Sequence, residues 1–408
     1  MSYHEKLKNT GQKKLLALDG GGIRGLVTIE VLAKIEAMLR ETSGEQKMVL
    51  SDYFDYVAGT STGAVIGTLI SLGKSTDEIR QIYLDVGEEM FHKNAILARF
   101  AKLNGIVKVV KVGANMLGNK VLSRLNYQTS DYSEYRDTPL IETLQELLGK
   151  DEHGEDIQFS STKLKTLLMM VLSNADTDSP WPVTNNPKAK YNDPAREDCN
   201  SRTPLWQMVR ASSAAPTVFP PQRIKLGKKE VTFVDGGITP YNNPAFQLFI
   251  QSTLKPYKLE WPTGEQKMLI VSIGTGQAIV DHAARDSSGM DAADLVETVL
   301  DGLMNSSVYQ QDLLCRAFGK CVSGDVLDDE LGNLTGNTGL LDEKLFTYAR
   351  YNIMLSRKGL DELGLSHINP KDVSKLDSIK FMGELQEIGK QIGEQKVQAE
   401  HFADFPHS

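Results

Sequence analysis

The 408 residues are enough for one large domain, or for a domain with a substantial appendage. A content of 40% hydrophobic and 24% charged residues is ordinary for a folded globular chain. The net charge of -8 argues against a general nucleic-acid-binding protein. The N-terminal segment lacks the apolar core of a signal peptide, and no run approaches the roughly 20 apolar residues that span a bilayer. These features predict a cytoplasmic protein that meets a membrane only at its surface.

Cysteine and histidine offer no metal-binding pattern. Cys199, Cys315 and Cys321 contain no CxxC pair, and their odd number does not fit a disulfide framework, so we expect free thiols. No HxxxH or HExxH spacing occurs among the seven histidines. We therefore expect neither a metal nor another cofactor.

The first part of the chain alternates between strand and helix patterns. Apolar residues predict a strand at 14–19, an amphipathic helix over 26–39, a strand at 53–58 and a buried helix over 64–72. Apolar runs predict further buried strands at 167–172, 231–234 and 268–273. This alternation predicts a parallel α/β sheet with helices on both faces.

The remaining segments are less regular. Residues 175–204 are rich in Pro, Asn and Asp and are expected to form a long surface loop. Residues 289–318 have a helical apolar stripe. Residues 371–400 have a thinner stripe, and Gly383, Gly389 and Gly393 lower the helix propensity there.

The segment Gly59-Thr60-Ser61-Thr62-Gly63 matches GxSxG, in which a nucleophilic serine lies on a sharp turn between a strand and a helix. The predicted strand before it and the apolar helix after it provide that context. A serine at a helix N-terminus also meets positive partial charge, which favours a developing anion. The alternative is a serine that only caps the helix.

A second glycine-rich turn has two interpretations. Gly20, Gly22 and Gly25 satisfy GxGxxG, the dinucleotide-binding fingerprint, but no acidic residue ends a second strand about 20 residues further on. Alternatively, the glycines aim backbone N–H groups at the oxyanion of an acyl-transfer reaction. Arg24 would then brace the loop or meet a phosphate of the substrate. On the residues alone, both interpretations stay open.

Candidates for the general base of Ser61 are the acidic residues and histidines that follow it in the chain. None of the histidines there lies in a catalytic-looking motif. Asp235, by contrast, follows an apolar strand and precedes Gly236 and Gly237, and open α/β sheets place their sites at strand ends. The alternative is an aspartate that only closes a turn.

Taken together, these segments resemble the patatin-like phospholipase family. The resemblance rests on five segments in the expected order: DGGGIRG at 19–25, GTSTG at 59–63, RASSAAPTVFPP at 210–221, DGG at 235–237 and SIGTG at 272–276. It implies a three-layer α/β fold, with a central, mostly parallel sheet covered by helices on both faces, plus a C-terminal helical region. The catalytic domain would span 14–280, and 281–408 would pack on the core or regulate it.

The resemblance also implies roles for individual residues. Ser61 would be the nucleophile and Asp235 its only partner, in a dyad without histidine. The remaining positions would support them: the backbone of Gly20, Gly21 and Gly22 as the oxyanion hole, Arg24 and Gly25 as supports of that loop, and Gly59, Gly63, Gly236 and Gly237 as turn residues. Asp19 receives no role.

The implied activity is that of a phospholipase A, which cleaves fatty-acyl esters of membrane phospholipids without a cofactor. Bacterial proteins of this family with an added C-terminal region include antiviral effectors activated by cyclic nucleotides. The chain resembles those in size and layout, although no residue identifies a nucleotide site. No nucleic-acid partner is expected, and homo-oligomerisation is left open.

One local charge asymmetry points to a membrane. Residues 92–130, within an expected cap-like insertion at 91–135, contain no acidic residue and seven Lys or Arg residues interleaved with apolar ones. Such a basic amphipathic surface suits an anionic bilayer at the inner face of the cytoplasmic membrane. The alternative is a helical cap whose lysines are simply solvated.

Overall fold

A computed structural model describes residues 2–91, 138–216, 219–278, 292–336, 340–377 and 379–407. Its centre is a sheet with strand order β5-β6-β3-β2-β1-β7-β10-β9, in which β4 pairs with β3 off this path. The strands of this sheet are β1 (Lys13–Leu18), β2 (Tyr56–Thr60), β3 (Leu167–Asn174), β4 (Ser179–Thr184), β5 (Gln222–Leu226), β6 (Lys229–Asp235), β7 (Met268–Ile273), β9 (Lys320–Ser323) and β10 (Thr347–Tyr351). Two short strands, β8 (Gln277–Ala278) and β11 (Met354–Leu355), pair separately.

The strands nearest the centre are parallel, as the sequence predicts. Strand β1 pairs in parallel with both β2 and β7, and β2 pairs in parallel with β3. Every residue of β1, β2 and β7 is buried. Burial on both faces explains why these strands are apolar runs rather than alternating patterns.

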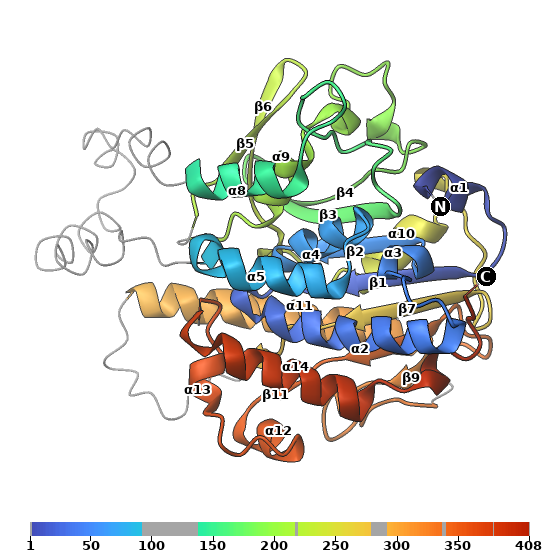
Figure 1. Cartoon of the computed structure of the whole chain (residues 1–408), viewed down its shortest axis with the longest axis vertical. Coiled ribbons are helices and arrows are strands. Elements are labelled where there is room, and N and C mark those ends of the chain that lie inside the picture. Colours follow the sequence, from blue (N-terminus) through green and yellow to red (C-terminus); the bar gives the residue numbers. More distant parts are fainter. Residues whose placement is uncertain are drawn as a thin grey trace, which may run out of the picture.

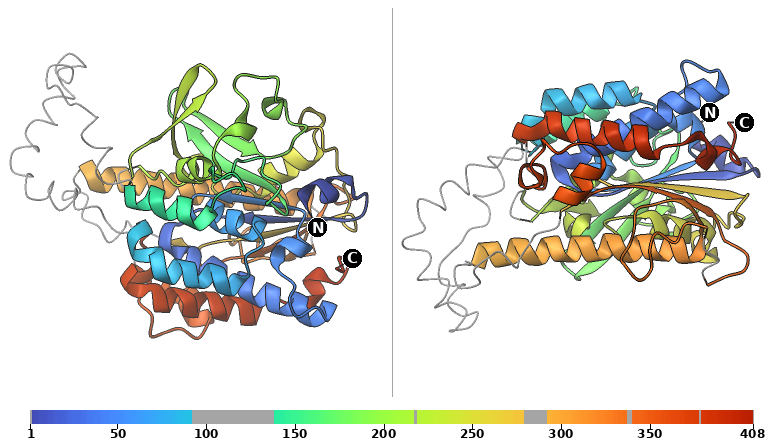
Figure 2. Two further views of the ribbon diagram at one scale, coloured as in Figure 1. Left: turned by 45° about the horizontal axis from the view of Figure 1, so that its top comes forward. Right: turned by 90° about the horizontal axis from the view of Figure 1, so that it is seen from below.

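Helices cover both faces of this sheet (Figure 1). In the view from below, α2 and α14 lie on one side of the sheet and α11 on the other (Figure 2). The α-helices are α1 (Tyr3–Lys8), α2 (Gly25–Ser43), α3 (Leu50–Tyr53), α4 (Thr62–Ser71), α5 (Thr76–Phe91), α8 (Thr138–Leu148), α9 (Leu205–Ser212), α10 (Ala245–Thr253), α11 (Ala292–Phe318), α12 (Arg357–Glu362), α13 (Pro370–Val373) and α14 (Met382–Lys396). The expected three-layer α/β fold with a helical C-terminal region is thus confirmed.

The two ends of β3 have different neighbours along one edge. Strand β4 pairs with β3 from Met169 to Asn174, so it occupies one edge of β3 along these residues. Strand β2 pairs with the start of β3 as far as Val171, and β6 pairs antiparallel from Leu172 onward. A strand has only two edges, so β2 and β6 share the other one and meet end to end.

The expectation of a long surface loop over 175–204 is wrong in part. Residues Ser179–Thr184 form β4 and pair with β3. The prolines at 180 and 182 argue against a central strand. Among the strands that the structure describes, however, β4 pairs only with β3, and an edge strand tolerates missing N–H groups. The ring of Trp181 packs 4.9 Å from that of Phe233 and anchors the strand.

The C-terminal region does more than add helices. Strand β10 pairs in parallel with β7 and β9 pairs with β10, so the region extends the central sheet. Helix α14 packs on α2 through Gly389 and Gly393. A Cβ on Gly389 would lie 2.6 Å from the carbonyl oxygen of Val27, and one on Gly393 would lie 2.9 Å from Cβ of Lys34. The glycines that weaken the helix pattern therefore allow close packing. The division into a catalytic domain at 14–280 and a regulatory or packing region at 281–408 stays a prediction.

The basic insertion expected at 91–135 falls almost wholly outside the described residues, beyond the end of α5 at Phe91. The membrane-contact hypothesis for 92–130 is therefore not tested by the structure. Among the helices of the described ranges, none combines the length and the apolar content needed to cross a bilayer.

Candidate active site

The turn between β2 and α4 holds Ser61 in an unusual backbone conformation. Its φ is 54° and its ψ is -122°, and positive φ is rare for residues other than glycine. Strained backbone of this kind is concentrated at functional sites. The flanking glycines make the turn possible, because a Cβ on Gly59 would lie 2.1 Å from the carbonyl oxygen of Gly63. One on Gly63 would lie 2.3 Å from that of Leu18. The predicted strand-turn-helix context of the serine is confirmed.

Ser61 and Asp235 meet where β2 and β6 end. The hydroxyl of Ser61 donates a hydrogen bond to Oδ2 of Asp235 at 2.7 Å. The other carboxylate oxygen accepts from the backbone N–H of Gly237 at 2.6 Å. Gly236 lies against β3, since a Cβ there would be 2.1 Å from the carbonyl oxygen of Val171. The structure thus brings together a hydroxyl and a carboxylate as nucleophile and base require.

The environment of Asp235 raises its proton affinity above that of a free aspartate. The side chain is buried, and loss of solvent raises its pKa to about 6. The hydrogen bonds from Gly237 and Ser61 and the positive charge of Arg210 lower the pKa, but they only partly offset burial. A base with a pKa near the working pH combines the ionised form with a useful proton affinity.

The glycine loop after β1 lies directly against the serine. A Cβ on Gly20 would be 3.2 Å from Cβ of Ser61 and 2.4 Å from Oδ1 of Asn242. The N–H of Gly20 donates to the carbonyl oxygen of Asn242 at 3.3 Å. Within the described part of the chain, the amides of Gly21 and Gly22 make no such hydrogen bond. Gly21 and Gly22 are therefore better candidates for oxyanion donors than Gly20.

A C-terminal segment holds the far side of this loop. The carbonyl oxygen of Leu376 accepts from the N–H of Ile23 at 2.9 Å and would lie 2.2 Å from a Cβ on Gly22. The side chain of Arg24 is buried and donates to the carbonyl oxygens of Gly21, at 3.4 Å, and Ser374, at 3.1 Å. These contacts favour the bracing role for Arg24 over contact with a substrate phosphate.

Gly25 has a packing role. A Cβ on Gly25 would lie 2.5 Å from Oγ1 of Thr62 in the first turn of α4. Gly25 therefore lets the start of α2 approach the helix that follows the serine.

Sequence reasoning missed two residues that shape the site. Ser212 accepts a hydrogen bond from the N–H of Ser61 at 3.0 Å and donates to the carbonyl oxygen of Val171 at 2.7 Å. Thr275 donates to the carbonyl oxygen of Gly20 at 3.1 Å. Both lie in segments that carry the family resemblance, at 210–221 and 272–276, which was the available signal.

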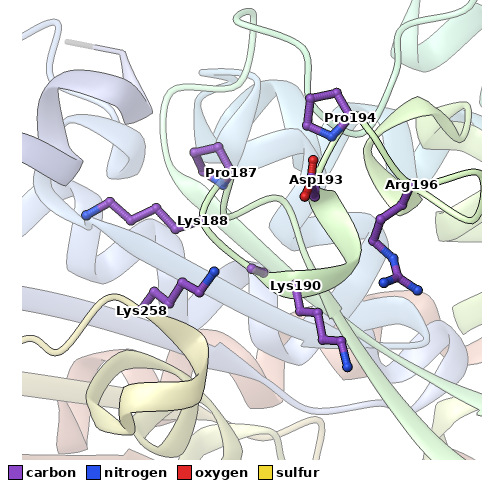
Figure 3. Close-up of a pocket in the computed structure, with 8 residues that line it drawn as sticks. Pro187, Lys188, Lys190, Asp193, Pro194, Arg196 and Lys258 are labelled. Atoms are coloured by element: carbon purple, nitrogen blue, oxygen red, sulfur yellow. The ribbon is translucent and has the colours of Figure 1, made fainter.

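A separate surface hollow of about 400 Å³ lies on the loop after β4 (Figure 3). Lys188, Lys190, Arg196 and Lys258 line it together with Asp193. The guanidinium of Arg196 already donates to both carboxylate oxygens of Asp198, at 2.8 and 2.9 Å. The hollow shares no residue with the dyad or the glycine loop.

Comparisons with known proteins agree with the motifs. Residues 16–249 match the family described as patatin-like phospholipase. A cGAMP-activated phospholipase of Escherichia coli is 26% identical over 264 residues, which are 64% of this chain and 62% of the relative. Another from Vibrio cholerae is 28% identical over 273 residues, or 67% of this chain and 66% of the relative. The alignment thus spans less than two thirds of either relative.

Among solved structures, VipD from Legionella pneumophila is 13% identical with a TM-score of 0.33, covering 92% of this chain and 67% of that one. A likeness at that level carries no weight for function. The family match is different, because it spans more than half of the chain and includes the glycine loop, the serine turn and Asp235. The chain therefore belongs to the patatin-like phospholipase family.

Proposed function

We propose that the protein is a lipid acyl hydrolase of the phospholipase A type, which cleaves fatty-acyl esters of membrane phospholipids. The observation that carries this proposal is the 2.7 Å hydrogen bond from the partly buried Ser61 to the buried Asp235, made beside the glycine loop. Membership of the patatin-like phospholipase family supports the choice of substrate class.

The proposed reaction has two steps. In the first, Asp235 accepts the hydroxyl proton while Oγ of Ser61 bonds to the ester carbonyl carbon. The amides of Gly21 and Gly22 and the N-terminus of α4 stabilise the oxyanion. The bond to the lysolipid oxygen then breaks, and that oxygen takes the proton from Asp235.

In the second step, Asp235 removes a proton from water, which attacks the acyl-enzyme. The ester bond to Ser61 breaks, its oxygen takes back the proton, and the fatty acid leaves.

The dinucleotide-binding alternative fits the geometry poorly. A pyrophosphate in such a site lies on the N-terminal amides of the helix after the loop. Here the N–H of Ile23 is already bonded to the carbonyl oxygen of Leu376, and Thr275 and Leu376 fill the space beside Gly21 and Gly22.

We further propose that a cyclic nucleotide activates this hydrolase. It is supported by the two relatives from Escherichia coli and Vibrio cholerae, which are cGAMP-activated phospholipases. We also propose a cytoplasmic location with peripheral membrane contact through 92–130, which rests on the charge pattern of that segment.

The test is fluorophosphonate labelling of the wild type, Ser61→Ala and Asp235→Asn, alongside hydrolysis of phosphatidylglycerol and phosphatidylcholine vesicles. We expect labelling of the wild type, no labelling of Ser61→Ala, and fatty acid released only by the wild type. All assays are run with and without cGAMP. Hydrolysis that persists in Ser61→Ala or in Asp235→Asn would refute the dyad, and a wild type inert under both conditions would refute the hydrolase proposal.

A further inference from the structure

A buried ion pair lies directly behind the glycine loop. Nη1 of Arg350 donates to Oδ1 of Asp19 at 2.8 Å, and Nη2 donates to Oδ2 at 2.5 Å. The two side chains are 1% and 4% exposed. A bidentate pair of this kind fixes the orientation of the carboxylate as well as its charge.

The pair joins elements that are far apart in the sequence. Asp19 follows the last residue of β1 and immediately precedes Gly20, whereas Arg350 belongs to β10. Strand β7 lies between them, with Ser272 opposite Arg350 in the register. Arg350 lies outside the segment 16–249 that carries the family match. The C-terminal region therefore supplies the ion-pair partner of Asp19.

The hydrogen bonds of Arg350 continue into the rest of the site. Its Nη1 also donates to Oγ of Ser272 at 2.8 Å, and Ser272 donates to Oδ1 of Asn243 at 3.2 Å. The neighbouring residue, Asn242, accepts the N–H of Gly20 at 3.3 Å. Arg350 is therefore connected to the glycine loop both through Asp19 and through the loop that follows Gly237.

Charge makes this arrangement more than a packing contact. The proposed reaction develops an oxyanion beside the glycine loop, and a negative carboxylate in the same buried region opposes that charge. An arginine that pairs with both carboxylate oxygens offsets that opposing field and also holds the carboxylate next to Gly20 in place.

We propose that Arg350 is a positioning residue for acyl transfer, which sets the geometry of the glycine loop and neutralises Asp19 behind it. This inference rests on the proposed function of the Ser61–Asp235 site. It assigns to the C-terminal region a direct contribution to the reaction, made through the sheet.

The experiment measures the rate constant of fluorophosphonate inactivation at saturation, the concentration for half-saturation and the fraction of labelled enzyme. It compares the wild type, Arg350→Gln, Arg350→Lys and the double variant Asp19→Asn/Arg350→Gln. Arg80→Gln is the control, because Arg80 of α5 makes a bidentate pair with buried Glu30 of α2, at 2.7 and 2.9 Å, and not with Asp19. Thermal unfolding of each variant is recorded in parallel.

We expect Arg350→Gln to lower the inactivation rate constant of the labelled fraction about 10²-fold, with the half-saturation concentration little changed, since small displacements of catalytic groups have effects of that order. The double variant removes both charges and should recover to within about tenfold of the wild type. Arg350→Lys keeps the charge without the planar fork, so its inactivation rate constant should lie between those of the wild type and Arg350→Gln. Arg80→Gln should lower the unfolding temperature without lowering the rate constant.

Three results would overturn the inference. One is a wild-type rate constant in folded Arg350→Gln. Another is a loss that Asp19→Asn does not relieve. The third, if Arg350→Gln does not fold, is a wild-type rate constant in Arg350→Lys. Failure of the proposed function is distinct, because it would leave the wild type itself unlabelled.

Discussion

The buried carboxylate of Asp235 should lower the free energy of unfolding at neutral pH, compared with an uncharged side chain at the same position. Its pKa is raised by burial from 3.8 to about 6. One pKa unit corresponds to about 1.4 kcal/mol, so keeping Asp235 ionised in the folded state costs about 3 kcal/mol. Because the folded-state pKa is the higher one, the proton stabilises the fold below the unfolded value near pH 4. This stabilisation is lost as the pH rises through about 6.

Replacing Asp235 by asparagine removes this cost. The amide oxygen of the new side chain can accept from the N–H of Gly237, and its NH₂ group can donate to Oγ of Ser61, so both hydrogen bonds have a counterpart. We expect Asp235→Asn to raise the free energy of unfolding by about 1–3 kcal/mol at pH 8 and by about a third of that at pH 4.5, which is only slightly above the unfolded pKa. The same variant should lose hydrolysis, because asparagine accepts no proton.

The assay is urea unfolding of both proteins at pH 4.5, 6 and 8, with the slope checked for constancy. Asp156→Asn is a control of opposite sign. Burial raises the pKa of Asp156, but hydrogen bonds from Lys150, Trp206 and Gln145 outweigh it and leave the pKa below its usual value. Asp156→Asn should therefore lower the free energy of unfolding at pH 8. A difference between Asp235→Asn and the wild type that is independent of pH, or that reverses sign at pH 8, would refute the reasoning.

Two further substitutions test the serine turn. Ser61→Gly should be more stable than Ser61→Ala by about 1 kcal/mol in urea unfolding, because glycine tolerates the φ of 54° without strain, and equal stabilities would contradict that account. Gly63→Ala should lower the free energy of unfolding by at least about 3 kcal/mol, because its Cβ would lie 2.3 Å from the carbonyl oxygen of Leu18. The control Gly302→Ala in α11 meets no atom of the described chain within 4 Å and should stabilise by up to about 1 kcal/mol; a tolerated Gly63→Ala would contradict the packing.

Local patterns pointed to the two side chains of the proposed dyad, and the family resemblance implied their roles. GxSxG between an apolar strand and an apolar helix identified Ser61, and an aspartate after an apolar strand identified Asp235. Such signals are readable because a turn with positive φ or a close backbone contact restricts the residue types within a few positions. Buried parallel strands were equally readable as apolar runs, and β7 has the predicted bounds.

The glycines of helix α14 could not be explained from the sequence. Gly389 and Gly393 look unfavourable in isolation, and only the approach of α2 explains them. Strand β10 was missed for a related reason, since Arg350 interrupts its apolar pattern and makes sense only opposite Asp19. The benefit of such residues lies in partners distant along the chain.

The sequence by itself therefore determined which side chains carry the proposed chemistry, and only the tertiary structure decided how they meet. Asp235 ends a strand that runs antiparallel to β3, and it reaches Ser61 because β2 and β6 approach end to end along the same edge of β3. The raised pKa of Asp235 follows from that burial, and the pairing of Asp19 with Arg350 follows from the order of β1, β7 and β10. Local patterns report local backbone requirements, whereas strand order and desolvation depend on the packing of the whole chain.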